Sequence, residues 1–207
     1  MSQSVLQSTR QMHAAERTPV ASDLIVTDLI GLPAFAESGT VHFVVESPRG
    51  SVSKLKYDPD LGVMALARPL VLGLAYPCDW GFIPSTQGPD GDPIDAFIMW
   101  DGTSYPGTVV TCRPIGVLRV EQNSEKEGGR QRNDRIALLP VEAPRYDDIR
   151  GVNDLSERQR SELERFFLTA VAFESKDLKI LGWGGPQAAT SLVQHSQKRK
   201  RARRKKR

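Results

Sequence analysis

The sequence predicts a mainly β fold with a C-terminal helix, an α+β protein whose strands form an antiparallel barrel or sandwich. Two observations predict this class. Short apolar stretches bounded by glycine and proline recur at about one per ten residues, a spacing typical of such β folds. An amphipathic stretch with helical periodicity follows them.

The strand pattern is clearest at residues 40–46, where Val41, Phe43 and Val45 occupy every second position. Such alternation places the three side chains on one face of a strand. The charged, glycine-containing stretch 123–133 predicts an exposed hairpin tip. The other predicted strands are 51–58, 62–70, 95–100, 108–121 and 135–142.

The predicted helix covers about residues 156–172. Ser156 followed by Gln159 has the pattern of a capping box, in which each side chain binds the other residue's backbone amide. Apolar side chains then recur at helical spacing, with charged residues on the other face. We expect this apolar stripe to pack against the barrel, and its members are Leu163, Phe166, Phe167 and Ala170.

With 207 residues, the chain is long enough for one domain with irregular ends. We expect a flexible N-terminal extension over 1–22, a barrel domain over 23–190 and a basic disordered tail over 191–207. No apolar run approaches the roughly 18 to 20 residues that span a bilayer, and the N-terminus lacks the apolar centre of a secretory signal. Cys78 and Cys112 lie in apolar stretches without metal-ligand spacing. Buried free thiols in a cytoplasmic protein are therefore expected.

The net charge of +3 reflects the C-terminus alone. Nine of the 28 Lys and Arg residues lie at 198–207. The rest of the chain has the remaining 19 Lys and Arg and all 25 Asp and Glu, so it is net acidic. Two interpretations stay open for this tail. It binds nucleic acid or another polyanion, or acts as a targeting signal, or else it is a solvated end without a partner.

The stretch DGDPIDAF (90–97) puts Asp90, Asp92 and Asp95 within six residues. An EF-hand loop needs an oxygen ligand where this chain has Ile94 and a glycine where it has Asp95, so that calcium loop is excluded. A cluster of carboxylate oxygens that binds a hard divalent cation remains, most simply Mg²⁺. A solvated acidic turn is the alternative.

Cationic and phenolic side chains on neighbouring strand-like segments favour the metal site. Arg49, Lys54, Arg68 and Tyr76 can hold phosphate oxygens while a metal ion neutralises charge and activates water. Each alone is more simply a surface residue, but the combination with the carboxylates is what phosphoryl transfer requires.

Several motifs in order resemble the soluble family I inorganic pyrophosphatases over about residues 40–185. They are ESPRGSVSK (46–54), Arg68 followed after seven residues by YPCDWGFIP (76–84), DGDPID (90–95), PIGVL (114–118) and a late Gly-Trp at 182–183. The resemblance implies a five-stranded OB-like β-barrel with a C-terminal helix. It also implies Mg²⁺-dependent hydrolysis of pyrophosphate to two phosphates, by a homo-oligomer.

Carried over position by position, the resemblance implies roles for individual residues. The metal-binding acids are Asp90, Asp92, Asp95, Asp134 and, through water, Glu46. The residues on pyrophosphate or phosphate oxygens are Lys54, Arg68, Tyr76 and Arg135. Catalysis falls to Asp92, which accepts the proton of the attacking water, and to Tyr76.

The acidic part of the motif set departs from the family at several positions. Lys56 stands where the family has a glutamate, and Trp80 where it has a tyrosine. Two family aspartates align with the amides Gln122 and Asn133, although acids stand next to both. Either Glu121 or Gln122, and either Asn133 or Asp134, faces the metals.

The helix departs further, because Ala170 and Val171 replace a Tyr-Lys pair that holds the leaving phosphate in the family. Lys176 or Lys179 is a candidate replacement. Two alternative functions stay open as a result: a catalytically impaired module that binds phosphate or polyanions, and a hydrolase of a larger phosphoanhydride.

Overall fold

The computed structural model describes residues 28–124 and 128–204, with the backbone alone for 198–204. The expected N-terminal extension, 1–22, lies outside the described residues. Within them, no helix is both long and apolar enough to cross a membrane.

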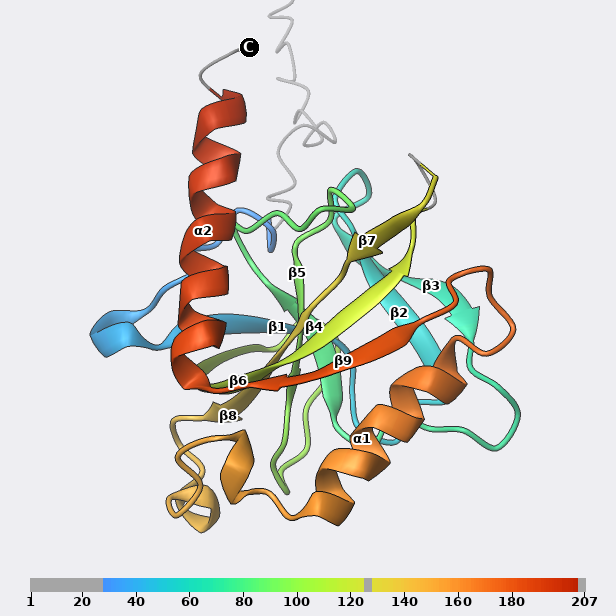
Figure 1. The fold of residues 1–207 in the computed structure, drawn as a ribbon. Coiled ribbons are helices and arrows are strands. Elements are labelled where there is room, and N and C mark those ends of the chain that lie inside the picture. Colours follow the sequence, from blue (N-terminus) through green and yellow to red (C-terminus); the bar gives the residue numbers. More distant parts are fainter. Residues whose placement is uncertain (1–27, 125–127, 205–207) are drawn as a thin grey trace, which may run out of the picture.

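Five strands close into a barrel (Figure 1). Around the ring they are β1 (Val41–Ser47), β4 (Asp79–Ile83), β5 (Ile94–Ile98), β8 (Arg135–Pro140) and β6 (Val109–Asn123). Pairing of β6 with β1 closes the ring, and only the β5–β8 pair in it is parallel. The predicted mainly β, OB-like barrel is confirmed.

Two further strands and one hairpin are attached to this ring. β7 (Arg130–Arg132) and β9 (Lys179–Gly184) each pair with β6 beyond the barrel. β2 (Ser53–Asp58) and β3 (Val63–Pro69) pair only with each other. The predicted hairpin at 123–133 is the β6–β7 turn, of which residues 125–127 lie outside the described part.

The strand β4 was not among the predicted strands because all five of its residues are buried and no polar alternation marks it. Gly81 in β4 is required by a close approach to β1: a Cβ there would lie 1.8 Å from the Val44 carbonyl oxygen. Any larger residue would force the two strands apart.

The predicted helix is α1 (Glu157–Ala170). The Gln159 amide donates to Ser156 Oγ (3.2 Å) and the Ser156 amide donates to Gln159 Oε1 (2.9 Å), so the capping box forms. The apolar stripe is buried against the barrel. The Phe167 ring lies 5.5 Å from Phe97 of β5 and 5.4 Å from Trp80 of β4. Short 3-10 turns occur at Glu37–Gly39, Pro144–Tyr146 and Val152–Asp154.

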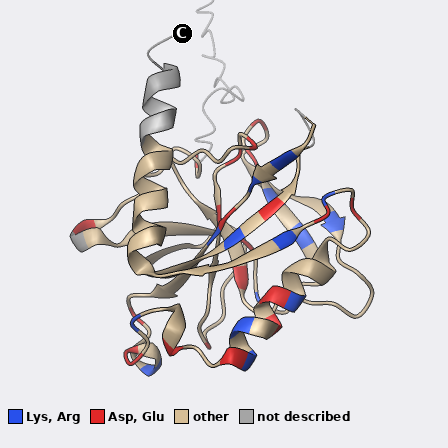
Figure 2. Ribbon diagram, viewed as in Figure 1, with Lys and Arg blue, Asp and Glu red and all other residues tan. Residues whose placement is uncertain are grey.

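The expectation of a disordered tail from residue 191 is corrected by a second helix, α2 (Pro186–Arg204). Ala189 and Val193 are fully buried against the barrel core, which anchors the start of this helix. Burial of these apolar side chains stabilises the first turns of α2. The prediction of disorder relied on the basic residues at the end of the chain and overlooked this apolar contact. Figure 2 shows that the side chains described on α2 include no Lys, Arg, Asp or Glu.

Both cysteines are buried and free, as expected. Burial raises the pKa of the Cys78 and Cys112 thiols, so each is protonated at neutral pH.

Candidate active site

A pocket of about 200 Å³ lies among β2, the loop before β5 and the end of α1. Most of its charged lining comes from residues far apart in the sequence. Its carboxylates are Glu46, Asp90, Asp92 and Asp95, which we call the acidic side. Its cations are Lys54, Lys56, Arg68, Arg135 and Lys176. The end of α1, Ala170 and Val171, together with Arg68 and Lys176, is called the helix side below.

The acidic side is shaped by a tight turn before β5. The Gly88 amide donates to the Asp92 carbonyl (2.7 Å), and Gly91 adopts a φ of 92°, a left-handed conformation that glycine tolerates. The Asp92 amide donates to Asp90 Oδ1 (3.1 Å). β5 then begins, and Asp95 pairs opposite Phe82 of β4. The turn therefore aims three carboxylates into one pocket.

Glu46, in β1, is the buried member of the acidic side, with 6% of its surface exposed. The Tyr57 amide donates to its Oε1 (2.9 Å). Burial raises the pKa of Glu46 to about 7, and the charge of Asp95 adds to this effect. Glu46 is therefore close to half-protonated at neutral pH.

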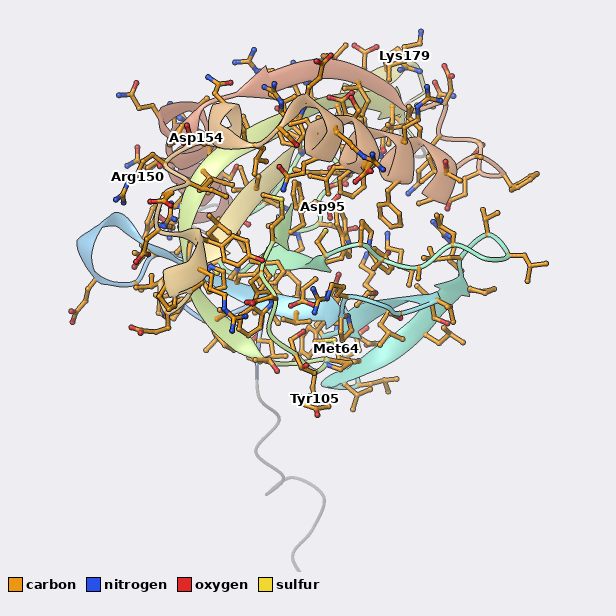
Figure 3. The ribbon with its side chains drawn as sticks, turned by 90° about the horizontal axis from the view of Figure 1, so that it is seen from below. Met64, Asp95, Tyr105, Arg150, Asp154 and Lys179 are labelled. Carbon is orange, nitrogen blue, oxygen red and sulfur yellow. The ribbon has the colours of Figure 1, made fainter. Side chains whose placement is uncertain are left out.

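Asp95 is the central charge of the pocket, and Figure 3 shows it between α1 and the strands. Burial lowers the pKa of Lys54 and of Arg135, and the charge of Asp95 is the strongest opposing influence on both. Burial raises the pKa of Asp90, and Asp95 raises it further. Close carboxylates of this kind favour a bound cation.

Lys56 supplies one such cation from the protein itself. Its Nζ lies 2.7 Å from Asp92 Oδ2, and about half of each side chain is exposed. An ion pair so exposed contributes little to stability. It does place a positive charge at the carboxylate that the resemblance assigns to proton transfer.

Three buried polar atoms of the pocket residues have no hydrogen-bond partner within the described structure. They are Arg135 Nε, Trp80 Nε1 and Gln122 Oε1. The Arg135 guanidinium carbon lies 5.0 Å from the Phe167 ring centre and 5.7 Å from that of Trp80. Buried polar groups without partners are costly, so these two donors and one acceptor indicate a pocket suited to a polar ligand.

The structure decides between the neighbouring acids and amides left open by the sequence. Gln122 and Asn133 line the pocket, whereas Glu121 and Asp134 do not. Glu121 accepts from Arg130 Nε (2.8 Å). Asp134 Oδ1 accepts from the Val120 amide (2.9 Å) and from Arg132 Nη2 (2.7 Å).

The predicted metal ligand Asp134 is therefore not brought together with the other acids. Asn133 and Asp134 are consecutive, and adjacent residues point to opposite sides of an extended chain. Both amides in the lining are uncharged, so the acidic side has four carboxylates among the described residues.

Tyr76 lines the pocket as predicted, with 5% of its surface exposed. Burial raises the pKa of Tyr76, which remains a neutral phenol. Its ring lies 5.1 Å from Phe166 of α1. Arg49, in contrast, donates to the carbonyls of Trp100 and Asp101 and does not line the pocket.

The helix side holds Lys176 and not Lys179. Lys176 belongs to the segment between α1 and β9, and it could not be distinguished from Lys179 by sequence pattern. Figure 3 shows Lys179 at the periphery of the molecule. Ala170 and Val171 line the pocket without a side chain that can donate a hydrogen bond.

The donor set suits a hard divalent cation, because the acidic side offers only oxygen ligands and Gln122 Oε1 adds a buried acceptor without a partner. Within the described residues, however, no three Asp, Glu, His or Cys side chains are grouped to hold one metal ion. A hydrated Mg²⁺ ion is compatible with this spacing, since it keeps several waters and needs only one or two carboxylates.

Comparison with known proteins agrees with this geometry. Residues 43–201 match the family model described as inorganic pyrophosphatase. The chain belongs to the inorganic pyrophosphatase family. This match extends over nearly all of the barrel, α1, most of α2 and every residue of the pocket's charged lining.

Individual relatives carry the same name. The chain is 37% identical over 167 residues to an inorganic pyrophosphatase of Synechocystis sp., covering 81% of this chain and 95% of that protein. It is similar to the crystal structure of inorganic pyrophosphatase from Thermus thermophilus, with a TM-score of 0.77 and 36% identity over 84% of this chain and 99% of that one. The Helicobacter pylori enzyme gives a TM-score of 0.72 at 27% identity, covering 82% and 98%.

Proposed function

We propose that this protein hydrolyses pyrophosphate to two phosphates in a Mg²⁺-dependent reaction. The observation that carries the proposal is that four carboxylates and five cationic side chains line one pocket. Phosphoanhydride hydrolysis requires both kinds of group, carboxylates for metal and proton transfer and cations for phosphate oxygens. The names of the relatives support pyrophosphate as the substrate.

Asp90, Asp92 and Asp95 would hold the metal, with Glu46 acting through water. Bound Mg²⁺ supplies charge neutralisation and lowers the pKa of a coordinated water. Asp92 accepts the proton of the attacking water, because its carboxylate lines the pocket beside the other acids. Lys56 Nζ donates to Asp92 Oδ2, so proton transfer to this carboxylate is easier when that contact breaks.

The phosphate oxygens are bound by the cations around the acidic side. Lys54 and Arg135 are partly or fully buried, so their charges are weakly screened and act strongly on an anion. Arg135 Nε has no partner among the described residues and is available to a phosphate oxygen. Tyr76, a neutral phenol, donates a hydrogen bond to the transferred group.

A second candidate is a module that binds phosphate without efficient hydrolysis. The observation that favours it is the Lys56–Asp92 ion pair together with the uncharged Gln122 and Asn133 in the lining. These residues reduce the negative charge that draws metal ions into the pocket. A larger phosphoanhydride as substrate stays a third possibility.

We further propose a cytoplasmic homo-oligomer whose basic tail, 198–207, contacts nucleic acid or another polyanion. The free buried thiols support a reducing compartment, and nine Lys and Arg in ten residues support a polyanion partner.

The test is phosphate release from pyrophosphate, with and without Mg²⁺, by the wild type, Asp92→Asn and the control Asp101→Asn. Asp101 is a surface acid paired with Arg145 outside the pocket. We expect Mg²⁺-dependent turnover, a loss of about 10² to 10⁴ in Asp92→Asn, and wild-type turnover in the control. If the wild type binds Mg²⁺ and diphosphonate but shows no turnover, the hydrolase proposal is wrong and the phosphate-binding module is favoured.

A further inference from the structure

The two cations of the helix side, Arg68 and Lys176, lie close to a third, Lys54. Arg68 comes from β3, Lys54 from β2, and Lys176 from the segment between α1 and β9. After burial, the charges of Lys176 and Arg68 are among the influences that lower the pKa of Lys54, so the three lie close enough to repel one another. Like charges held together favour the binding of an anion.

Arg68 is held at the C-terminal end of α1. Its Nη2 donates to the carbonyl of Ala170 (2.9 Å), the last residue of the helix. The negative end of the helix dipole therefore offsets part of the Arg68 charge. A second cation on the helix side strengthens the attraction of this end of the pocket for a phosphate group.

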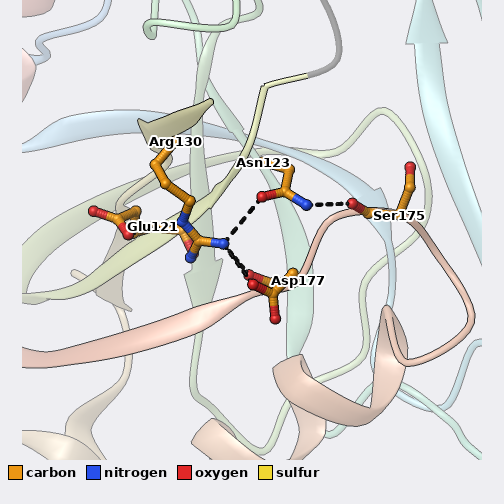
Figure 4. Close-up of polar contacts among 5 residues, drawn as sticks. All are labelled: Glu121, Asn123, Arg130, Ser175 and Asp177. Carbon is orange, nitrogen blue, oxygen red and sulfur yellow. Dashed lines mark hydrogen bonds and ion pairs between the residues drawn. The ribbon is translucent and has the colours of Figure 1, made fainter. Parts of the chain in front are cut away.

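Lys176 is that second cation, and its backbone is fixed on both sides. The Asn123 side chain donates to the Ser175 carbonyl (2.8 Å), and the Asn123 amide donates to the Lys176 carbonyl (2.7 Å). Arg130 Nη1 donates to both the carbonyl (2.8 Å) and the carboxylate (2.7 Å) of Asp177 (Figure 4).

These contacts tie three consecutive residues to the β6–β7 hairpin. The fixed backbone explains why Lys176, with 22% of its side chain exposed, reaches the pocket while Lys179 three residues later does not. The missing donors of α1 are thus compensated from a different segment.

Glu174 bridges the two cations in the structure. Its carboxylate forms an ion pair with Arg68 Nη2, and its Oε2 lies 3.6 Å from Lys176 Nζ. Glu174 Oε1 is buried and meets Arg68 as an ion pair without hydrogen-bond geometry. A phosphate group offers more oxygens and more charge to the same two cations, so it competes well for them.

We propose that the Glu174 carboxylate is an internal counter-ion of Arg68 and Lys176, and that it is displaced when a phosphate group binds to these two cations at the end of α1. The inference rests on the proposed function in taking the anion to be one phosphate group of a phosphoanhydride. It adds a binding residue, Lys176, and a residue that opposes binding, Glu174.

The experiment is isothermal titration calorimetry of methylenediphosphonate, a non-hydrolysable pyrophosphate analogue, and of inorganic phosphate. Four proteins are compared at one fixed Mg²⁺ concentration: the wild type, Lys176→Met, Glu174→Gln and the matched control Lys179→Met. Thermal unfolding of each variant establishes that it is folded.

We expect Lys176→Met to weaken diphosphonate binding about 10- to 100-fold, the effect of losing one charge-assisted hydrogen bond. Glu174→Gln should strengthen binding about threefold to tenfold, because the competing charge is gone while the shape is kept. Lys179→Met should stay within about twofold of the wild type, since Lys179 lies outside the pocket.

Wild-type affinity in Lys176→Met would overturn the subsite, and so would binding of neither probe by the wild type. Weaker binding in Glu174→Gln would overturn the role of the counter-ion. The titration measures binding and not turnover, so it tests the subsite independently of the proposed hydrolysis. If the protein shows these affinities but releases no phosphate from pyrophosphate, the proposed hydrolysis is refuted and the phosphate-binding subsite stands.

Discussion

The two sides of the pocket are built in different ways. The acidic side takes three of its four carboxylates from one short stretch, residues 90–95, and only Glu46 comes from elsewhere. The helix side takes Arg68, Val171 and Lys176 from three separate segments. A local motif therefore makes one side, and long-range packing makes the other.

The two sides are expected to tolerate sequence change differently. A turn that aims several carboxylates at one point needs all of its residues in fixed spacing. A side assembled from separate segments can lose the donors at Ala170 and Val171 and gain Lys176 from a neighbouring loop, because any backbone nearby can supply a long, flexible cation.

The largest effect should follow from Asp95→Asn on the acidic side. Asp95 offsets the buried charges of Lys54 and Arg135 and is a proposed metal ligand, so the variant removes two functions at once. We expect phosphate release to fall at least about 100-fold. The Asp101→Asn control should keep wild-type turnover, and an Asp95→Asn enzyme as active as that control would show that Asp95 is dispensable.

A smaller effect, on stability, is expected from Glu46. Burial raises its pKa in the folded protein from 4.5 to about 7, so between these values the folded state binds more protons than the unfolded one. The contribution of Glu46 to the free energy of unfolding should be highest below pH 4.5 and should fall as pH rises to 7, by up to about 3 kcal/mol.

Urea unfolding of the metal-free protein at a series of pH values measures this dependence. Glu46→Gln carries no titrating group at this position, so its stability should change less over the same pH range. Identical slopes for the wild type and Glu46→Gln would mean that Glu46 is not the group responsible.

The smallest effect concerns Lys56, the cation on the acidic side. Lys56→Met removes a positive charge 2.7 Å from Asp92, so Mg²⁺ should bind roughly threefold to tenfold more tightly. Calorimetric titration with Mg²⁺ measures the change, with Lys179→Met as the charge-matched control. Equal Mg²⁺ affinity in the two variants would indicate that Lys56 does not compete with metal.

Much of the fold could be predicted because its signals are local. Alternation marked β1, and the capping box marked the start of α1. Burial on both faces hid β4, which has no exposed positions to alternate with its buried ones. The start of α2 was missed because Ala189 and Val193 precede a strongly basic run that dominates the composition of the C-terminus.

The chemical groups of the pocket could be predicted from sequence alone, through an acidic turn, a set of cations and the motif order of the pyrophosphatase family. Which of several neighbouring residues lines the pocket depends on how the chain packs. The pocket is lined by Gln122 and not Glu121, by Asn133 and not Asp134, and by Lys176 and not Lys179. For Gln122 in β6 the physical reason is register, because a shift of one residue turns a strand side chain to the opposite face. β6 carries irregularities in its pairing after Pro114 and after Arg119, so counting along the sequence cannot keep that register, and the packing of β7 and β9 sets it.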